Sequence, residues 1–175
     1  PGLVDNKTGV VIQTPNMPFK NTEFRELFQS EWNVPVYLGN DANCAALGEF
    51  LAGAAKGCKS AVMITLGTGV GGGIVLDGQI YDGVNHAGAE IGHTVIVSGG
   101  EPCTCGRRGC WEAYASATAL IRQTKAKMLE NKDSIMWEMV GGDIEKVSGR
   151  TSFDAMRKGD KAGKEVVDQY IRYIG

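Results

Sequence analysis

The sequence predicts an α/β fold, and three observations support this prediction. Short apolar runs predict strands at residues 9–13, before a loop at residues 14–18, and at residues 60–66. Apolar or alanine-rich segments predict helices at residues 22–32 and 42–55. Hydrophobic residues make up 43% of the 175 residues, which is enough for a packed core. We therefore expect a folded α/β protein of one domain or of parts of two.

Two polar residues, Asn40 and Asp41, follow the segment after the first predicted helix. Asn21 and Thr22 are expected to cap the helix at residues 22–32. Residues 35–38 are apolar or aromatic and predict a strand that ends at Gly39-Asn40-Asp41. This order places Asn40 and Asp41 at the carboxyl end of a strand, where open α/β sheets bind ligands.

The middle of the chain predicts a pair of strands around a glycine-rich turn. Residues 60–66 form a near-continuous apolar run, the pattern of a strand covered on both faces. Residues 67–73 are expected to form the turn, and residues 74–76 the strand that follows it. Asp77-Gly78 is a hairpin signal that leads into a further strand at residues 79–81.

The second half predicts an irregular loop followed by helices. Residues 83–110 are glycine-rich and irregular, apart from a short strand expected at residues 93–97. From Trp111 to about Asn131 the pattern is helical. A polar connector follows, and two more helices are expected near residues 151–158 and 161–174.

Charge and cysteine content narrow the class of protein. The 18 basic and 20 acidic residues give a formal net charge of −2, so neither nucleic acid nor a membrane surface is an expected partner. No apolar run reaches the roughly 18 residues of a membrane helix, and no secretory signal opens the chain. Five cysteines, three of them within eight residues, favour an intracellular metal site over disulfides. We expect a cytoplasmic protein that binds a small molecule, and an opening proline places its true start upstream.

Three of the cysteines predict a metal site. Cys103, Cys105 and Cys110 lie on a glycine-bearing loop. A structural zinc ion takes four ligands in a tetrahedron, typically thiolate sulfur and imidazole nitrogen. His93, ten residues before Cys103, is the expected fourth ligand, and His86 is the other histidine. The alternative, ordinary loop cysteines without a metal, accounts poorly for three of them in eight residues.

The glycine-rich turn at residues 66–73 has two interpretations. It lies between two strands rather than before a helix, so it is neither a dinucleotide-binding fingerprint nor a Walker loop. Its backbone N–H groups and the Thr68 hydroxyl could bind a phosphate group. The alternative is a tight bend without a ligand, and the turn taken alone does not distinguish the two.

Three carboxylates lie beside these motifs. Asp41 could act as a general base toward an attacking hydroxyl, or it could simply cap a helix. Glu90 and Glu112 flank the cysteine loop, and with His93 they could bind sugar hydroxyls. A metal-bound histidine can serve both purposes, with one ring nitrogen on the metal and the other on the sugar. The alternative for Glu112 is an acidic residue in the first turn of a helix.

Taken together, these segments resemble the ROK family, which comprises repressors, open reading frames and sugar kinases. They occur in the family's order over residues 1 to about 118, and the cysteine motif followed by glutamate is the most specific of them. The matching segments are Pro1–Asp5, Asn40–Asn43, Leu66–Gly73, Glu90–His93 and Cys103–Glu112.

The resemblance implies a fold and a domain organisation. The fold looks like the actin-like, hexokinase-type ATPase, with two α/β lobes around a cleft. Residues 1–43 would end the small lobe, and residues 44–175 would form the large lobe with its zinc-binding loop. The family's first phosphate loop, of the type Asp-x-Gly-x-Thr, and its adenosine-binding segment are not in the sequence. We therefore expect a fragment that does not turn over by itself.

The resemblance also implies roles for individual residues. Asp41 would be the catalytic base that deprotonates the sugar 6-hydroxyl. The sugar would be bound by Asn40, Asp41, Glu90, His93 and Glu112. The ATP phosphates would be bound by Gly67, Thr68 and Gly69. Structural zinc would be bound by His93, Cys103, Cys105 and Cys110, and magnesium would arrive with ATP because phosphoryl transfer needs its charge neutralised.

The implied activity is ATP-dependent phosphorylation of glucose at its 6-hydroxyl, carried out by a homodimer. One alternative is a kinase for another hexose, such as fructose, N-acetylmannosamine or N-acetylglucosamine. The other is a sugar-responsive transcriptional repressor, whose DNA-binding domain would lie upstream of residue 1. Asp41 favours a kinase, and the sequence does not distinguish ATP from polyphosphate as the phosphate donor.

Overall fold

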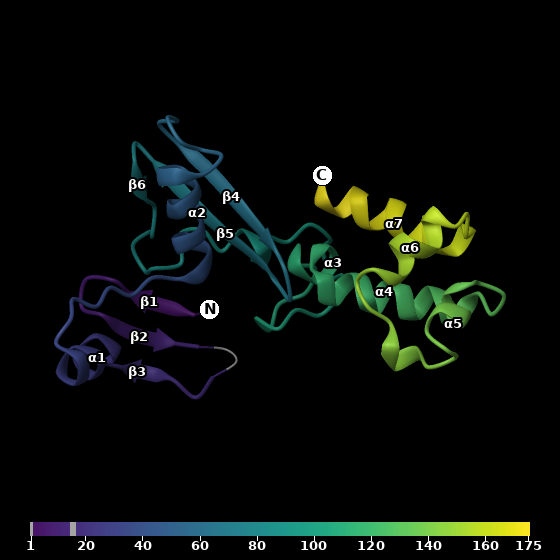
Figure 1. Ribbon diagram of the computed structural model, residues 1–175, viewed down its shortest axis with the longest axis horizontal. Helices are drawn as coiled ribbons and strands as arrows, with labels where there is room; N and C mark the ends of the chain where they lie inside the picture. Colours follow the sequence, from purple (N-terminus) through teal and green to yellow (C-terminus); the bar gives the residue numbers. More distant parts are fainter. Residues whose placement is uncertain (1, 15–16) are drawn as a thin grey trace. The chain divides into compact units, whose positions relative to one another are not determined.

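The computed structural model describes residues 2–14 and 17–175 (Figure 1). Pro1 of the first family segment and residues 15–16 of the expected loop lie outside this description. The chain forms two compact units. The first unit is Pro1–Thr65 with Gly71–Glu90, and the second unit is Leu66–Val70 with Ile91–Gly175. The lobe boundary after residue 43 stays a prediction.

The first unit begins with a three-stranded antiparallel sheet. Its strands are β1 (Leu3–Asp5), β2 (Val10–Gln13) and β3 (Lys20–Thr22), in the order β1-β2-β3 (Figure 1). The strand predicted at residues 9–13 is thus confirmed as β2. Helix α1 (Phe24–Trp32) follows and contacts β2. A row of aromatic rings runs along it, with centroid separations of 4.8, 5.6 and 5.0 Å, through Phe19, Phe24, Phe28 and Trp32.

Two predictions around α1 are wrong. The N-cap residue is Glu23, which makes no side-chain capping bond, because Thr22 still belongs to β3 and Asn21 has a left-handed backbone with φ of 48°. Residues 35–38 form no strand in the described chain, and Tyr37 is 86% exposed. An apolar run becomes a strand only where another strand supplies hydrogen bonds, and no described strand pairs with this one.

The first unit continues with a helix packed on a second sheet. Helix α2 (Asp41–Ala52) precedes β4 (Ala61–Leu66), β5 (Val70–Leu76) and β6 (Gln79–Ile80), in the sheet order β4-β5-β6. The predicted hairpin turn at Asp77-Gly78 is confirmed, since both residues have left-handed φ, 47° and 82°, as a type I′ turn requires.

Strand β5 begins earlier than expected, so the glycine turn is confined to residues 67–69. A Cβ atom at Gly73 would lie 2.5 Å from that of Ala46, so glycine there lets α2 lie directly on the strand. Strand β4 was expected to be covered on both faces, which is wrong for the described chain. Its side chains alternate between half-buried and exposed, and Val62 is 65% exposed because the described residues cover one face only.

The second unit begins with a short 3₁₀ helix, η1 (Ile91–His93), in place of the strand expected at residues 93–97. In that segment Val95 forms only an isolated bridge with Cys110. The helix expected from Trp111 to Asn131 is divided into α3 (Glu112–Ala115) and α4 (Ala117–Glu130). Ser116 between them is extended, with ψ of 161°, and its hydroxyl accepts a hydrogen bond from Ala119 N–H to cap α4.

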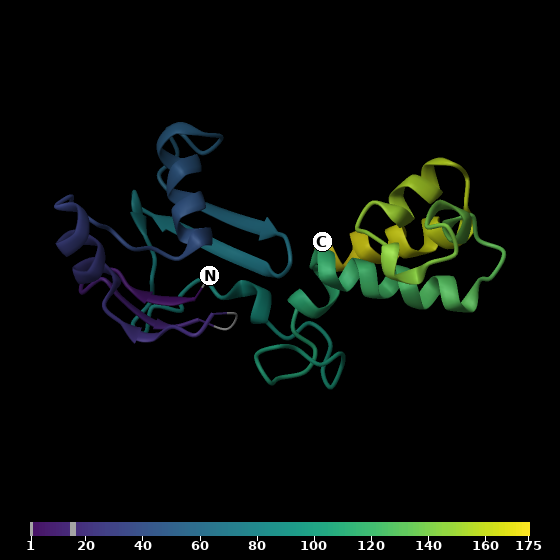
Figure 2. The same ribbon diagram turned by 60° about the horizontal axis from the view of Figure 1, so that its bottom comes forward.

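The remaining helices of the second unit gather beside α4 (Figure 2), and they share two apolar clusters, one with Met128 and Met136 and the other with Leu120 and Tyr170. These helices are α5 (Met136–Met139), η2 (Ile144–Lys146), α6 (Thr151–Arg157) and α7 (Lys161–Ile174). The predictions for α6 and α7 are confirmed, whereas α5 lies in the segment expected to be a polar connector. In the described chain, no helix has both the length and the apolar character needed to cross a membrane.

Candidate active site

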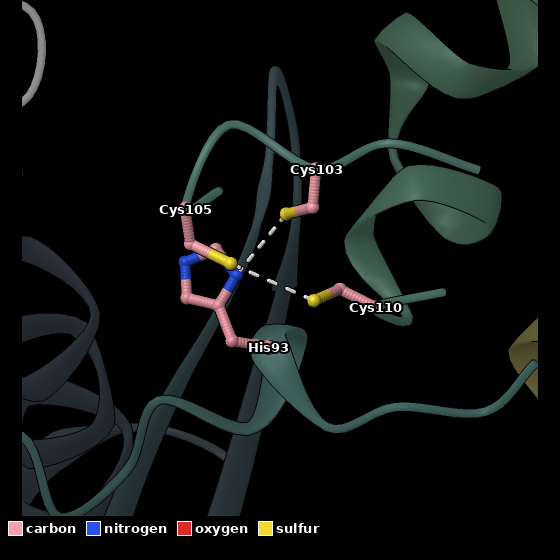
Figure 3. Close-up of side chains that lie close together, drawn as sticks. All are labelled: His93, Cys103, Cys105 and Cys110. Carbon is pink, nitrogen blue, oxygen red and sulfur yellow. Dashed lines mark hydrogen bonds between the residues drawn. The ribbon is translucent and has the colours of Figure 1, made fainter. Parts of the chain in front are cut away.

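Four side chains of the second unit converge on one point. Their ligand atoms all lie within 4.8 Å of one another, and they belong to His93, Cys103, Cys105 and Cys110 (Figure 3). Cys103 Sγ lies 3.4 Å from His93 Nδ1, and Cys105 Sγ lies 3.6 Å from Cys110 Sγ. Ligand atoms of a tetrahedral zinc site are separated by about 3.3–3.8 Å, given metal–ligand distances of about 2.0–2.3 Å. These two separations match a four-coordinate site, and the ligand set of three thiols and one imidazole is that of a structural zinc site.

Backbone hydrogen bonds fold the loop that carries the cysteines. Cys103 N–H donates to Arg107 C=O at 2.9 Å, and Gly106 N–H donates to Cys103 C=O at 3.0 Å. The isolated bridge between Val95 and Cys110 joins the two ends of the loop. The three thiols are thus brought together by local turns, and His93 is added by η1.

The groups around Cys105 and Cys110 shift the pKa values of these two thiols in opposite directions. The backbone N–H of Arg107, with its side chain, lowers the pKa of Cys105 to about 6. Burial, followed by the adjacent thiols, raises the pKa of Cys110 to about 12. Arg107 thus favours the thiolate form of Cys105, whereas burial favours the thiol form of Cys110. Metal binding has to release the proton of Cys110.

The glycine turn is held by the start of α4. Ala117 N–H donates to Gly67 C=O at 2.8 Å, and the Thr118 hydroxyl donates to Thr68 C=O at 2.9 Å. The C=O and N–H of a trans peptide point in opposite directions, and no peptide bond described here is cis. The N–H groups of Thr68 and Gly69 therefore face away from α4. Two neighbouring N–H groups in this arrangement suit an anion.

Glu112 connects the glycine turn to the cysteine loop. Its Oε2 accepts a hydrogen bond from Val70 N–H at 3.0 Å, and its Oε1 accepts one from the Thr104 hydroxyl at 3.3 Å. A Cβ atom at Gly69 would collide with the same carboxylate, so glycine there lets the Glu112 side chain approach the turn. Glu112 thus bonds to protein donors here, and its predicted contact with sugar stays a prediction.

Asn40 and Asp41 have distinct positions at the start of α2. Asn40 is the N-cap residue, and its Oδ1 accepts from Ala42 N–H at 2.9 Å and from Asn43 N–H at 3.3 Å. The capping alternative considered for Asp41 therefore belongs to Asn40. Asp41 is the first helical residue and is exposed, so its carboxylate lies at the positive end of the helix dipole and accessible to solvent.

The structure groups the predicted site residues by unit. The first unit holds Asn40, Asp41 and the exposed Glu90. The second unit holds the glycine turn, Glu112 and the four metal-binding candidates.

Sequence reasoning missed one polar cluster in the first unit. Asp82, directly after the hairpin, accepts hydrogen bonds from Asn6 and Asn43. Asn43 belongs to the Asn40–Asn43 segment that was singled out in the sequence, but nothing local linked it to Asp82.

Comparison with known proteins assigns the family. The family model described as "ROK family" matches residues 1–175. The chain belongs to the ROK family, whose members include both sugar kinases and regulators. The resemblance stated from the motifs is thereby confirmed.

Two relatives have different activities. The chain is 40% identical to the glucokinase of Halalkalibacterium halodurans, over 100% of this chain and 53% of that protein. It is also 40% identical to the xylose repressor of Bacillus subtilis, over 77% of this chain and 35% of that protein. The chain thus spans about half the length of the curated glucokinases it matches.

A solved structure confirms the fold. The structure of a ROK family glucokinase from Streptomyces griseus, in complex with glucose and AMPPNP, matches with a TM-score of 0.85 and 33% identity. The match covers 98% of this chain and 56% of that one. The fold is the actin-like, hexokinase-type ATPase fold, of which this chain comprises part.

Proposed function

We propose that this chain is the sugar- and phosphate-binding part of an ATP-dependent hexose kinase that phosphorylates glucose at its 6-hydroxyl. The observation that carries the proposal is the 40% identity to a glucokinase along the whole chain. The exposed Asp41 carboxylate and the two outward-facing N–H groups of the glycine turn supply the two functions that phosphoryl transfer needs, a base and an anion site.

Asp41 is the proposed base. Its carboxylate accepts the proton of the 6-hydroxyl as the hydroxyl oxygen attacks the terminal phosphoryl group. Asn40 supports this role because its side chain caps α2 and holds the first turn, on which Asp41 lies. Sugar hydroxyls would be bound by Asn40, Asp41, Glu90, His93 and Glu112.

The glycine turn is the proposed phosphate contact. Gly67 and Thr68 are held through their carbonyl groups, which leaves the Thr68 and Gly69 N–H groups directed toward the nucleotide phosphates. Magnesium bound with ATP neutralises the charge that develops on the phosphoryl oxygens.

Zinc is the proposed ion of the cysteine loop. Three sulfurs and one imidazole nitrogen form the ligand set of many structural zinc sites. In this role the ion stabilises the loop between His93 and Cys110, and with it the approach to Glu112.

The proposed kinase function also implies an oligomeric state and a cellular location. We expect a cytoplasmic homodimer, with residues 1–43 in the small lobe and residues 44–175 in the large lobe. A sugar-responsive repressor is the second candidate, because the xylose repressor of Bacillus subtilis is as similar in identity as the glucokinase.

The test is ADP release by the full-length protein with Mg-ATP and a panel of hexoses. We expect glucose-dependent ADP release, and Asp41→Asn should reduce it by about 10²–10⁴-fold while glucose binding is kept. Asp77→Asn makes the same change in the exposed hairpin turn, where asparagine is equally suitable, and should leave activity unchanged. Bound sugar without ADP release would contradict the kinase and support the repressor.

A further inference from the structure

The Asp82 carboxylate joins two segments that are distant in the sequence. Asn6 Nδ2 donates to Asp82 Oδ2 at 2.6 Å, and Asn43 Nδ2 donates to Asp82 Oδ1 at 3.1 Å. Asn6 directly follows β1, whereas Asn43 lies in the first turn of α2, two residues after Asp41. An ionised carboxylate only accepts hydrogen bonds, so it determines the orientation of both amides.

The orientation of the Asn43 amide leaves its side-chain oxygen without a hydrogen-bond partner among the described residues. With its Nδ2 directed at Asp82, its Oδ1 is buried and has no hydrogen-bond partner in the described structure. Rotating the amide by half a turn would place that oxygen against the carboxylate instead. A buried acceptor left unpaired destabilises a fold, and such groups are rare in native proteins. The Asp82 carboxylate therefore sets the orientation of the Asn43 amide.

The same aspartate begins the loop that leads to Glu90. Its backbone C=O accepts from Gly88 N–H at 2.8 Å, which closes the loop on itself. Farther along, His86 Nε2 lies 3.9 Å from Asp5 Oδ1, beside the turn that carries Asn6. Before it reaches Glu90, the loop is therefore closed by one backbone hydrogen bond and lies near Asp5 at His86.

We propose that Asp82 is a positioning residue of the sugar site. Its carboxylate holds the first turn of α2, and with it Asp41, in register with the loop that carries Glu90. Asn6, Asn43 and Asp82 all belong to the first unit, so the carboxylate links the turn after β1, the first turn of α2 and the segment after β6 within that unit. Asp82 acts through Asn43, and the inference rests on the function proposed above.

A carboxylate is required at position 82 because two amide donors need two acceptor oxygens. An asparagine there has one oxygen, so its NH₂ group would face one of the two donors. Asp82→Asn is therefore a nearly isosteric change that breaks one of the two bonds.

The experiment measures steady-state kinetics of the full-length protein and its Asp82→Asn variant. We expect kcat to fall at least tenfold and the glucose KM to rise several-fold, with the ATP KM within twofold of the wild type. A merely structural role would change the KM of both substrates together. Wild-type kcat and glucose KM in Asp82→Asn would overturn the inference.

Exchanging the two side chains, so that position 43 carries the carboxylate and position 82 the amide, should restore the activity lost in Asp82→Asn. In the double variant Asn43→Asp/Asp82→Asn, the amide at position 82 accepts from Asn6 and donates to the carboxylate at position 43. We expect this variant to recover to within about threefold of wild-type kcat, whereas Asn43→Asp alone places two carboxylates face to face and is impaired. A double variant no better than Asp82→Asn would overturn the proposal.

Asn43→Ala is a control that distinguishes a loss of activity from a loss of stability. It removes the bond to Asp82 together with the unpaired acceptor, so thermal stability should be kept while kcat falls. Unchanged kcat in Asn43→Ala would overturn the proposal.

Glucose binding by calorimetry, on the same variants, separates this inference from the proposed function. A wild type that binds glucose without releasing ADP rejects the kinase alone. In that case a weaker Kd in Asp82→Asn, restored by the exchange, supports the positioning role, and an unchanged Kd overturns it. Absence of both glucose binding and ADP release overturns both.

Discussion

Two neighbouring regions of the second unit are stabilised in different ways. In the cysteine loop, residues 94–110, only Gly109 and Cys110 are buried, and Val95 and Ile96 are exposed. In the helices from α4 to α7, Met128, Met136 and Ala155 are fully buried in one apolar cluster. The loop buries little apolar surface and is folded by backbone hydrogen bonds, whereas the helices have a conventional apolar core. We expect the proposed zinc ion, held by the four converging ligands, to stabilise the loop.

The largest expected effect is therefore removal of the metal. Stripping it with a chelator, or replacing a ligand in Cys110→Ser, should abolish hydrogen-exchange protection in residues 94–110 and leave α4 and α7 protected. Structural zinc sites contribute about 10–16 kcal/mol of apparent binding free energy in small peptides, so the loss should be complete. Exchange measured by mass spectrometry checks this.

Cys58→Ser is the matched control for metal removal, because Cys58 is exposed and outside the cluster. It should keep both the metal content and the protection of the loop. Equal protection of residues 94–110 with and without metal would show that the loop is ordered by other means.

An intermediate effect is expected in the helical core. Met128→Ala should destabilise the protein by about 2–5 kcal/mol, because it leaves a cavity among well-packed side chains. Metal affinity should not change. Urea unfolding followed by circular dichroism measures the first quantity, and a chelator competition the second.

Leu129→Ala, one position along α4, is the control for Met128→Ala, because Leu129 is 54% exposed. It should cost less than about 1 kcal/mol, as most surface substitutions do. A large loss of metal affinity in Met128→Ala would show that the two regions are not independent.

The smallest effect is expected at the ion pair between α4 and α7. Lys127 Nζ lies 2.6 Å from Glu165 Oε2, and this bond lowers the pKa of Glu165 and raises the pKa of Lys127. The stabilisation is present above the unfolded pKa of the glutamate and is lost as pH falls through its lowered folded pKa. It is also lost at high pH, as the lysine deprotonates.

Glu165→Gln should therefore lower Tm slightly at neutral pH and in low salt, and match the wild type in acid. Glu138→Gln, at an exposed glutamate on α5, is the control. Thermal scans across pH measure the difference, and a decrease that persists in acid would assign the effect to packing rather than to charge.

Much of this architecture could be predicted because it depends on local patterns. The α6 and α7 helices and the Asp77-Gly78 turn follow from apolar spacing and from residues that tolerate a left-handed backbone. The cysteine loop was recognised because its ligands lie close in the sequence and its turns are short. The predicted strand at residues 35–38 was wrong because pairing depends on a partner strand, which local sequence does not reveal.

The sequence by itself determined the family, the ligands that can meet in the cysteine loop, and the acidic residue at the start of α2. Only the tertiary structure decided which distant polar groups meet. Asn6 and Asp82 are separated by 76 residues, and Val70 and Glu112 by 42. A hydrogen bond requires its two groups to lie within about 3.5 Å in a suitable direction, and across such separations only the folded path of the chain sets that geometry.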